Sequence, residues 1–152
     1  MNHATDLLEI QQLLYRYCYH LDRGDLQQMA MLFAEARLIT PGGGTVENDP
    51  AAIVALYQEY TRIYDDTGTP KTRHIVANPI IDLAEDGLSA RCHSYIVVFQ
   101  ATGSLPLQPI IAGSNHDRFQ KTGGRWRYRE REIISELFGD LSQHMLQPFG
   151  PQ

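Results

Sequence analysis

Apolar side chains recur at intervals of three and four through the first sixty residues, which is typical of amphipathic helices. Asp6 and Glu9 form a capping box for a first helix, which Gly24 ends. Asp25 can cap a second helix, and Asn48–Pro50 starts a third. The apolar stripes of these helices comprise Leu7, Ile10, Leu14, Tyr17 and Leu21, then Met29, Leu32 and Phe33, and finally Ile53, Leu56, Tyr57, Tyr60 and Ile63.

From residue 70 onward the pattern changes to β-branched runs that turn signals separate, which indicates strands. The expected strands cover residues 72–83, 89–101, 110–121 and 125–137, and a short one precedes them at 37–40. Helices followed by hairpin strands predict an α+β fold, with the N-terminal helices packed on the concave face of a curved, mainly antiparallel sheet. A sheet of that kind curls around a pocket. We expect the tail from Gly139 either to cover an opening or to pack on a neighbouring subunit.

Length and composition limit the classes of function. The 152 residues predict a single domain over residues 1–152, and a net charge of −5 argues against nucleic acid or an anionic membrane as partner. No apolar run is long enough for a membrane span, and the first residues lack the order of a signal peptide. Cys18 and Cys92 stand in dissimilar contexts, which favours reduced thiols in a cytoplasmic protein.

The strand over residues 72–83 carries a histidine near its beginning. Alternation places His74, Val76, Asn78 and Ile80 on one face, and because both faces are largely apolar we expect a central, covered strand. His74 is then either a satisfied core residue or a catalytic one. Its natural partner is Asp22, at the edge of the first helix's apolar stripe, although an aspartate before a glycine turn is often simply solvated.

Later strands offer further polar side chains. His93 and Tyr95 share a face with Val97 and Phe99. Two polar rings followed by two apolar side chains are typical either of a pocket wall with a polar and an apolar end or of an outer sheet face. Asn115 could donate a hydrogen bond to a substrate oxygen, although an asparagine in a strand is more often a bulge or edge residue. The arginine row is most simply a solvated or intersubunit face; it comprises Arg125, Arg127, Arg129 and Arg131.

Neither a metal nor a phosphate is favoured. Six histidines are present, but no His-x-His, His-x-x-x-His or Cys-x-x-Cys spacing occurs. The glycine loop at Pro41–Gly44 lacks the downstream Lys-Ser/Thr of a phosphate loop. We therefore expect no metal and no cofactor.

Several short motifs together resemble the polyketide-cyclase (SnoaL-like) group of the nuclear-transport-factor-2-like superfamily. The motifs are Tyr17-x-x-x-x-Asp22-Arg23-Gly24-Asp25 with Leu32-Phe33, Thr72-Arg73-His74 with Asn78, Ala90-x-x-x-Ser94-Tyr95, and Gly123-Gly124-Arg125-Trp126-Arg127. The resemblance covers nearly the whole chain and implies a cone-shaped α+β barrel. The superfamily mixes enzymes with binding modules, so it implies a fold more strongly than a function.

Within that group the chain is most similar to scytalone dehydratase and hexachlorocyclohexane dehydrochlorinase, which use an Asp–His pair to remove a proton next to a leaving group. The resemblance implies Asp22 and His74 as that pair, with His93 and Asn115 as the dehydratase's second histidine and its asparagine. Two tyrosines of the dehydratase have no counterpart, since Leu21 stands at one position and none occurs near Ile39–Gly44. Scytalone itself is therefore not the expected substrate.

These observations predict a cofactor-independent lyase or isomerase, such as a dehydratase or cyclase, that acts on a small hydrophobic ring compound. The alternative is a non-catalytic module that binds a hydrophobic ligand or a protein, like the small subunit of a ring-hydroxylating oxygenase. In either case we expect a homo-oligomer. The catalytic residues would be His74, Asp22, His93 and Asn115, and the pocket wall would comprise Tyr17, Phe33, Leu56, Val76, Tyr95, Val97, Phe99 and Phe119.

Overall fold

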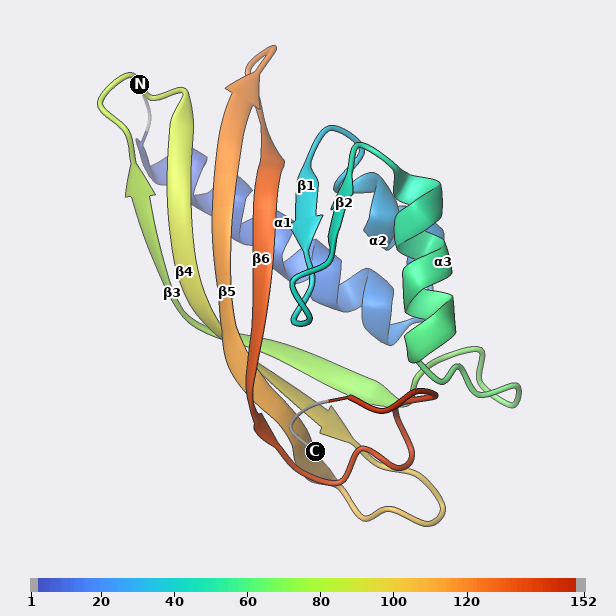
Figure 1. The fold of residues 1–152 in the computed structure, drawn as a ribbon. Helices are drawn as coiled ribbons and strands as arrows, with labels where there is room; N and C mark the ends of the chain where they lie inside the picture. Colours follow the sequence, from blue (N-terminus) through green and yellow to red (C-terminus); the bar gives the residue numbers. More distant parts are fainter. Residues whose placement is uncertain (1–2, 150–152) are drawn as a thin grey trace.

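The computed structural model describes residues 3–149, in which three helices pack against one face of a six-stranded sheet (Figure 1). The helices are α1 (His3–Asp22), α2 (Leu26–Met31) and α3 (Pro50–Tyr60). The strands are β1 (Arg37–Ile39), β2 (Thr45–Glu47), β3 (Thr72–Leu83), β4 (Ser89–Gln100), β5 (Gln108–Thr122) and β6 (Arg125–Phe138). No helix within residues 3–149 combines the length and the apolar character needed to cross a membrane.

The helices form where the apolar periodicity predicts them, but two of the predicted caps are wrong. α1 begins before Asp6, whose carboxylate instead accepts hydrogen bonds from Lys121 (2.6 Å) and the Trp126 indole (2.8 Å). Asp25 precedes α2, and within the described chain its side chain makes no capping bond. Asp49 does cap α3, since its carboxylate accepts from the Ala52 amide at 2.9 Å.

Gly24 ends α1 in the left-handed region, with φ of 72°. A Cβ at this position would lie 2.1 Å from the carbonyl oxygen of Gly68, in the connection between α3 and β3. Glycine is therefore required both by the turn and by the close approach of this connection. The approach places the end of α1 beside the beginning of β3, where Asp22 and His74 lie.

The sheet has the strand order β2-β1-β6-β5-β4-β3. The pairings are antiparallel except for β1 with β6, which is parallel. The predicted α+β fold with helices on one face of a mainly antiparallel sheet is confirmed. In the described part of the chain the sheet stays open, with β2 and β3 at its edges, and does not close into a barrel.

β3 is an edge strand, so the prediction of a central, covered strand is wrong. Its outer face is open, with Ile75 49% and Ile80 61% exposed. The pairing with β4 shifts register between Ala77 and Ile80, and Asn78 adopts φ of 51°. This bulge moves Ile80 away from the face that carries His74. The neighbouring Pro79 suits an edge, because proline cannot donate to a further strand.

A second bulge changes the arginine row. β5 pairs Arg118 with Glu130 but Phe119 with Tyr128, so Arg129 is an extra residue. From Arg131 to Ser135 the odd-numbered positions turn inward, and Arg131 is fully buried rather than on a solvated or intersubunit face as predicted.

The buried guanidinium of Arg131 has a carboxylate and two rings around it. It makes two hydrogen bonds to Asp117, at 2.7 and 2.8 Å. It also lies over the rings of Tyr17 and Tyr128, 4.3 and 4.9 Å from their centroids. These contacts compensate a charge that would otherwise be costly inside the core.

Asp117→Ala should lower the free energy of unfolding by about 3–5 kcal/mol, because it leaves Arg131 as an unpaired buried cation. Arg125→Ala removes an exposed guanidinium from the same strand and should change the free energy by less than about 0.5 kcal/mol. Urea denaturation followed by circular dichroism measures both. Asp117→Leu combined with Arg131→Met should recover most of the loss; a double variant as unstable as Asp117→Ala would contradict this account.

Candidate functional site

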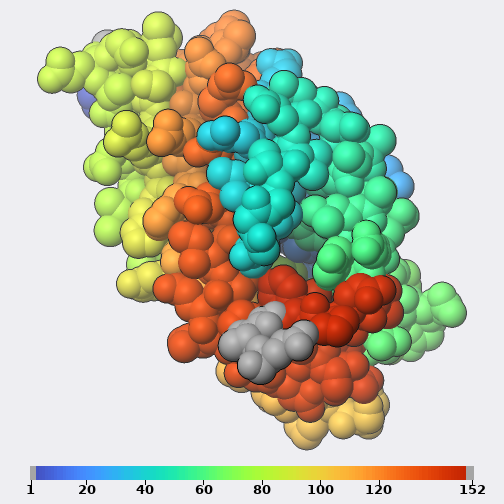
Figure 2. All heavy atoms as spheres, viewed as in Figure 1, coloured from blue at the N-terminus to red at the C-terminus, as the bar shows by residue number. Residues whose placement is uncertain are grey.

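A cavity of about 730 Å³ lies between the sheet, the helices and the C-terminal tail, which we define as residues 139–149. In Figure 2 the surface is hollowed between the β1–β2 loop, α3 and this tail. Side chains from α1, α3, the four long strands and the tail form the wall. Its apolar part includes Leu21, Leu56, Ile96, Val98, Ile111 and Ile133.

Asp22 and His74 meet at this cavity. Oδ1 of Asp22 lies 2.5 Å from Nδ1 of His74, and the His74 ring lines the cavity. The His74 backbone N–H donates to Oδ2 at 2.8 Å, and the Thr72 hydroxyl donates to Oδ1 at 2.8 Å. Three donors from the first residues of β3 therefore fix the carboxylate at the end of α1.

This arrangement keeps the Asp22 carboxylate ionised at neutral pH. Burial works to raise the pKa of Asp22, but the hydrogen bonds and charge of His74, together with Thr72, outweigh it and hold the pKa below its ordinary value of 3.8. An ionised Asp22 accepts a hydrogen bond from the Nδ1–H group of His74, so in the neutral form of this ring the lone pair lies on Nε2. A histidine oriented in this way can act as a general base toward a molecule in the cavity.

Other predicted site residues also lie at the cavity. Asn115 is 2% exposed and lines it from β5, and Leu56 lines it from α3. The Tyr17 hydroxyl lies 2.7 Å from the hydroxyl of Tyr57, and both tyrosines contribute to the wall. Burial raises the pKa of both phenols, so they remain protonated and can donate hydrogen bonds.

His93 and Tyr95 do not line the cavity, so the predictions of His93 as a catalytic residue and of Tyr95 as part of the pocket wall are wrong. Val97 and Phe99 share their face, which is the outer face of the sheet. The alternate positions of β4 face inward instead, and they are Ala90, Cys92, Ser94, Ile96 and Val98. Both parities of this strand carry apolar residues, so alternation alone did not identify the inner face. The His93 ring contacts the His116 ring on the outside, with centroids 4.7 Å apart.

Phe33, Val76 and Phe119 were also expected in the pocket wall, and the structure places them in the core. The Phe33 and Phe119 rings each pack 4.8 Å from the ring of Tyr128. Val76 is half-buried against the same core cluster. The three side chains face inward as predicted, but α1 and α2 fill the space beside them.

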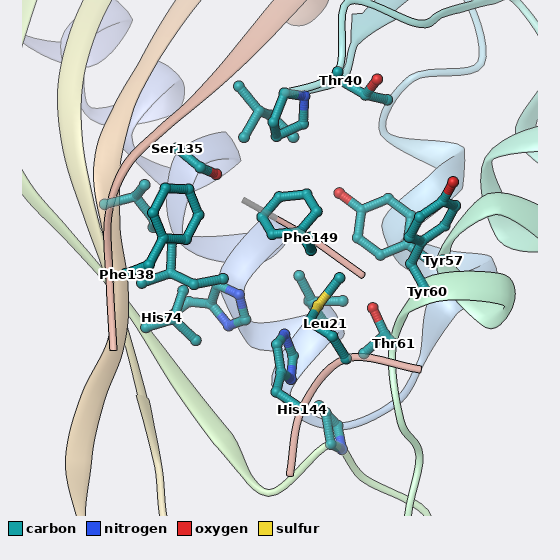
Figure 3. A pocket seen from close by; sticks show the side chains of 18 of the residues that line it. Leu21, Thr40, Tyr57, Tyr60, Thr61, His74, Ser135, Phe138, His144 and Phe149 are labelled. Atoms are coloured by element: carbon teal, nitrogen blue, oxygen red, sulfur yellow. The ribbon is translucent and has the colours of Figure 1, made fainter. Parts of the chain in front are cut away.

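The tail supplies part of the wall that the sequence pattern did not reveal. His144, Met145 and Phe149 line the cavity, and the Phe149 ring packs edge-on against the Phe138 ring of β6, with centroids 5.9 Å apart. Figure 3 shows the His144 and His74 rings at the same end of the cavity. The tail has no helical or strand periodicity, so its inward-facing residues could not be identified. Tyr57 and Tyr60 line the cavity too, and their place on the apolar stripe of α3 was a usable signal.

His144 is a buried, neutral imidazole. Burial is the largest cause that lowers its pKa, the nearby His74 lowers it further, and the result is about 4. Its side chain is therefore uncharged at neutral pH.

The described residues offer little support for metal or thiol chemistry. Within residues 3–149 no group of three or more His, Cys, Asp or Glu side chains could hold a metal ion. Cys18 and Cys92 are buried free thiols, and burial raises the pKa of each to about 12. A thiol with such a pKa is a poor nucleophile at neutral pH. The Asp22–His74 pair is a group that can transfer protons, and Asn115 and the Tyr17–Tyr57 pair can form hydrogen bonds at the cavity.

Comparison with solved structures reveals close likeness of fold. An NTF2-like protein with a cystatin-like fold from Novosphingobium aromaticivorans has 23% identity, covers 87% of this chain and 82% of its own, and gives a TM-score of 0.72. A provisionally assigned scytalone dehydratase from the same organism has 20% identity, coverage of 99% and 97%, and a TM-score of 0.71. At such identities the likeness shows the fold alone.

A third structure represents another kind of protein. It is the β subunit of a provisionally assigned aromatic-ring-hydroxylating dioxygenase from Novosphingobium aromaticivorans, with 21% identity, coverage of 95% and 98%, and a TM-score of 0.68. Among curated proteins there is no significant match. The family model of the SnoaL-like domain matches residues 2–132. The chain therefore belongs to the SnoaL-like family and has its NTF2-like fold.

Proposed function

We propose that this protein is a cofactor-independent enzyme that removes a proton from a small hydrophobic ring compound and so catalyses elimination, isomerisation or cyclisation. The observation that carries the proposal is the 2.5 Å contact between Asp22 and His74 at the wall of the cavity. A non-catalytic binding module has no need of this pair.

In the proposed reaction, Nε2 of His74 takes a proton from a carbon of the bound ligand. The imidazolium that forms is stabilised by the Asp22 carboxylate, which Thr72 and the His74 amide hold in place. A positioned base typically supplies about 10²–10⁴ in rate, so groups that stabilise negative charge on the ligand must add the rest. Asn115 and the Tyr17–Tyr57 pair are the candidates for this role.

The size and the lining of the cavity support a small hydrophobic ligand. A volume of about 730 Å³ lies within the range of small-molecule sites, and most of the wall is apolar. The buried, free thiols suit the cytoplasm, which we propose as the protein's compartment.

The outer sheet face supports self-association. Exposed apolar side chains gather on it, and they include Ile75, Ile80, Tyr95 and Leu137. Apolar exposure of this kind marks association surfaces. We therefore propose a homo-oligomer formed through this face. The same face would serve a partner protein if the alternative function, a binding subunit, were the correct one.

His74→Ala should abolish proton abstraction from a model ring ketone. With 2-tetralone in D₂O, wild-type protein should accelerate deuterium exchange at the carbons beside the carbonyl, and the variant should lose about 10²–10⁴ of that rate. Mass spectrometry of the recovered ketone measures the exchange. His116→Ala, which removes an exposed histidine from the outer sheet face, is the matched control and should exchange as fast as wild type. Equal rates for wild type and His74→Ala would remove His74 from the mechanism.

Asp22→Asn should flatten the acid side of the stability profile. The pKa of Asp22 in the folded chain lies below its ordinary value of 3.8, so the unfolded chain takes up the proton first as the pH falls. The carboxylate therefore stabilises the fold above about pH 4, and this contribution is lost as the pH falls through the folded pKa. Urea denaturation from about pH 6 down to about pH 3 measures the effect. The variant should be less stable at neutral pH and lose less on acidification, and parallel profiles would contradict an ionised Asp22.

Tyr95→Glu should dissociate the homo-oligomer, because it places a charge on the proposed apolar interface. Sedimentation velocity at micromolar concentration should show an oligomer for wild type and a monomer for the variant. Leu8→Glu changes an equally exposed leucine on α1, away from the sheet face, and should leave the oligomer intact. Monomeric wild-type protein would reject the homo-oligomer.

A further inference from the structure

The proton abstraction assigned to His74 leaves a second imidazole at the cavity without a role. His144 is 6% exposed and lines the cavity at the end where His74 lies (Figure 3). Its Nδ1 is buried and has no hydrogen-bond partner among the described residues. The orphaned Nδ1 costs stability, and it leaves Nε2 as the ring nitrogen that is available to a ligand in the cavity.

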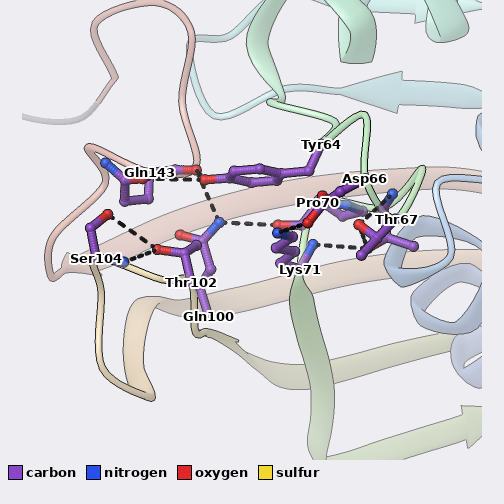
Figure 4. Close-up of polar contacts among 10 residues, drawn as sticks. Tyr64, Asp66, Thr67, Pro70, Lys71, Gln100, Thr102, Ser104 and Gln143 are labelled. Carbon is purple, nitrogen blue, oxygen red and sulfur yellow. Dashed lines mark hydrogen bonds and ion pairs between the residues drawn. The ribbon is translucent and has the colours of Figure 1, made fainter.

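The tail holds His144 in a defined position. The Arg62 amide donates to the His144 carbonyl at 2.8 Å, and the Leu146 amide donates to the Tyr60 carbonyl at 2.8 Å. The preceding carbonyl, that of Gln143, accepts from the Tyr64 hydroxyl at 2.6 Å and from the Gln100 amide at 3.1 Å (Figure 4). These bonds on both sides of His144 anchor the tail to the end of α3, to the connection that follows it and to β4. These hydrogen bonds fix the position of the His144 imidazole relative to the cavity.

The two imidazoles offer complementary groups. His74 donates its Nδ1 proton to Asp22 and keeps a lone pair on Nε2. His144 has no acceptor beside Nδ1, and a buried N–H without an acceptor is rarer in proteins than an acceptor without a donor. We therefore assign the proton of His144 to Nε2. One ring then accepts a proton while the other donates a hydrogen bond.

We propose that His144 donates an Nε2–H hydrogen bond to a carbonyl oxygen of the substrate, and that the substrate is a ring ketone whose α-proton His74 removes. This inference rests on the proposed function of His74 and names the class of molecule on which it acts. The low proton affinity of His144 fits the role, since burial and His74 keep its ring neutral. A neutral imidazole can polarise a carbonyl without giving up its proton.

For a ketone with a hydroxyl on the β-carbon, the proposed reaction is the elimination of water. The α-proton moves to Nε2 of His74, and the electrons of the C–H bond form a C=C bond while the carbonyl oxygen becomes an enolate oxygen. His144 hydrogen-bonds that oxygen and keeps its own proton. The enolate electrons then re-form C=O and a C=C bond to the β-carbon, and the hydroxyl leaves with the proton from His74 as water.

Ligand affinity tests the hydrogen bond without reference to turnover. The probes are 2-tetralone and tetralin, which share a bicyclic frame and differ in the carbonyl. Wild type should bind 2-tetralone about five-fold more tightly than tetralin, the effect of one hydrogen bond. His144→Phe keeps a ring of similar size and should abolish the preference, and His144→Gln should retain part of it through its amide N–H. Isothermal titration calorimetry measures these affinities.

The matched controls separate this proposal from the one on which it rests. His116→Phe introduces the same change on the outer sheet face and should keep the preference for 2-tetralone. His74→Ala should also keep it, because the base does not hold the carbonyl. Persistence of the preference in His144→Phe would overturn the role of His144. Undiminished deuterium exchange in His74→Ala would instead overturn the function proposed for His74.

Nitrogen-15 NMR of histidine-labelled protein at neutral pH supplies a readout that a merely structural role would not change. His144 should appear as the Nε2–H form and His74 as the Nδ1–H form. Addition of 2-tetralone should shift the His144 Nε2 signal, whereas tetralin should not. An Nδ1–H form of His144, or equal shifts with both probes, would reject the proposal.

Discussion

The carboxylate of Asp22 joins the end of α1 to the beginning of an edge strand. Anions are disfavoured at a helix C-terminus, and burial adds to the cost. The Thr72 hydroxyl and two N–H groups of His74 offset both effects. The same bonds align the first residues of β3 and turn the His74 ring toward the cavity. Helix packing, strand position and imidazole orientation thus depend on one side chain.

The pair could be predicted from the sequence mainly through the resemblance to the SnoaL-like group, because the apolar pattern gives the types of the two elements but leaves open whether Asp22 and His74 meet. The faces of the later strands could not. Bulges at Asn78 and Arg129 each change which positions point inward, and a period of two cannot reveal an extra residue. Arg131 therefore lies in the core although it continues an exposed row.

Two parts of the candidate site depend on contacts between distant segments. The inner face of β4 is the one that joins the hydrophobic core shared with the helices, and His93 carries no local sign of pointing outward. The tail is ordered by Tyr64, Gln100 and backbone groups after α3. Such partners lie about 40 or more residues away from the tail, beyond the reach of any local pattern.

The tail also has a consequence for how the protein can diversify. The family match ends at residue 132, whereas part of the cavity wall comes from residues 144–149. Mainly backbone groups anchor this wall to the scaffold, so its side chains can be exchanged while the anchoring bonds persist. Selection can then alter the tail side chains that line the cavity, such as Met145 and Phe149, while the contact between Asp22 and His74 stays unchanged.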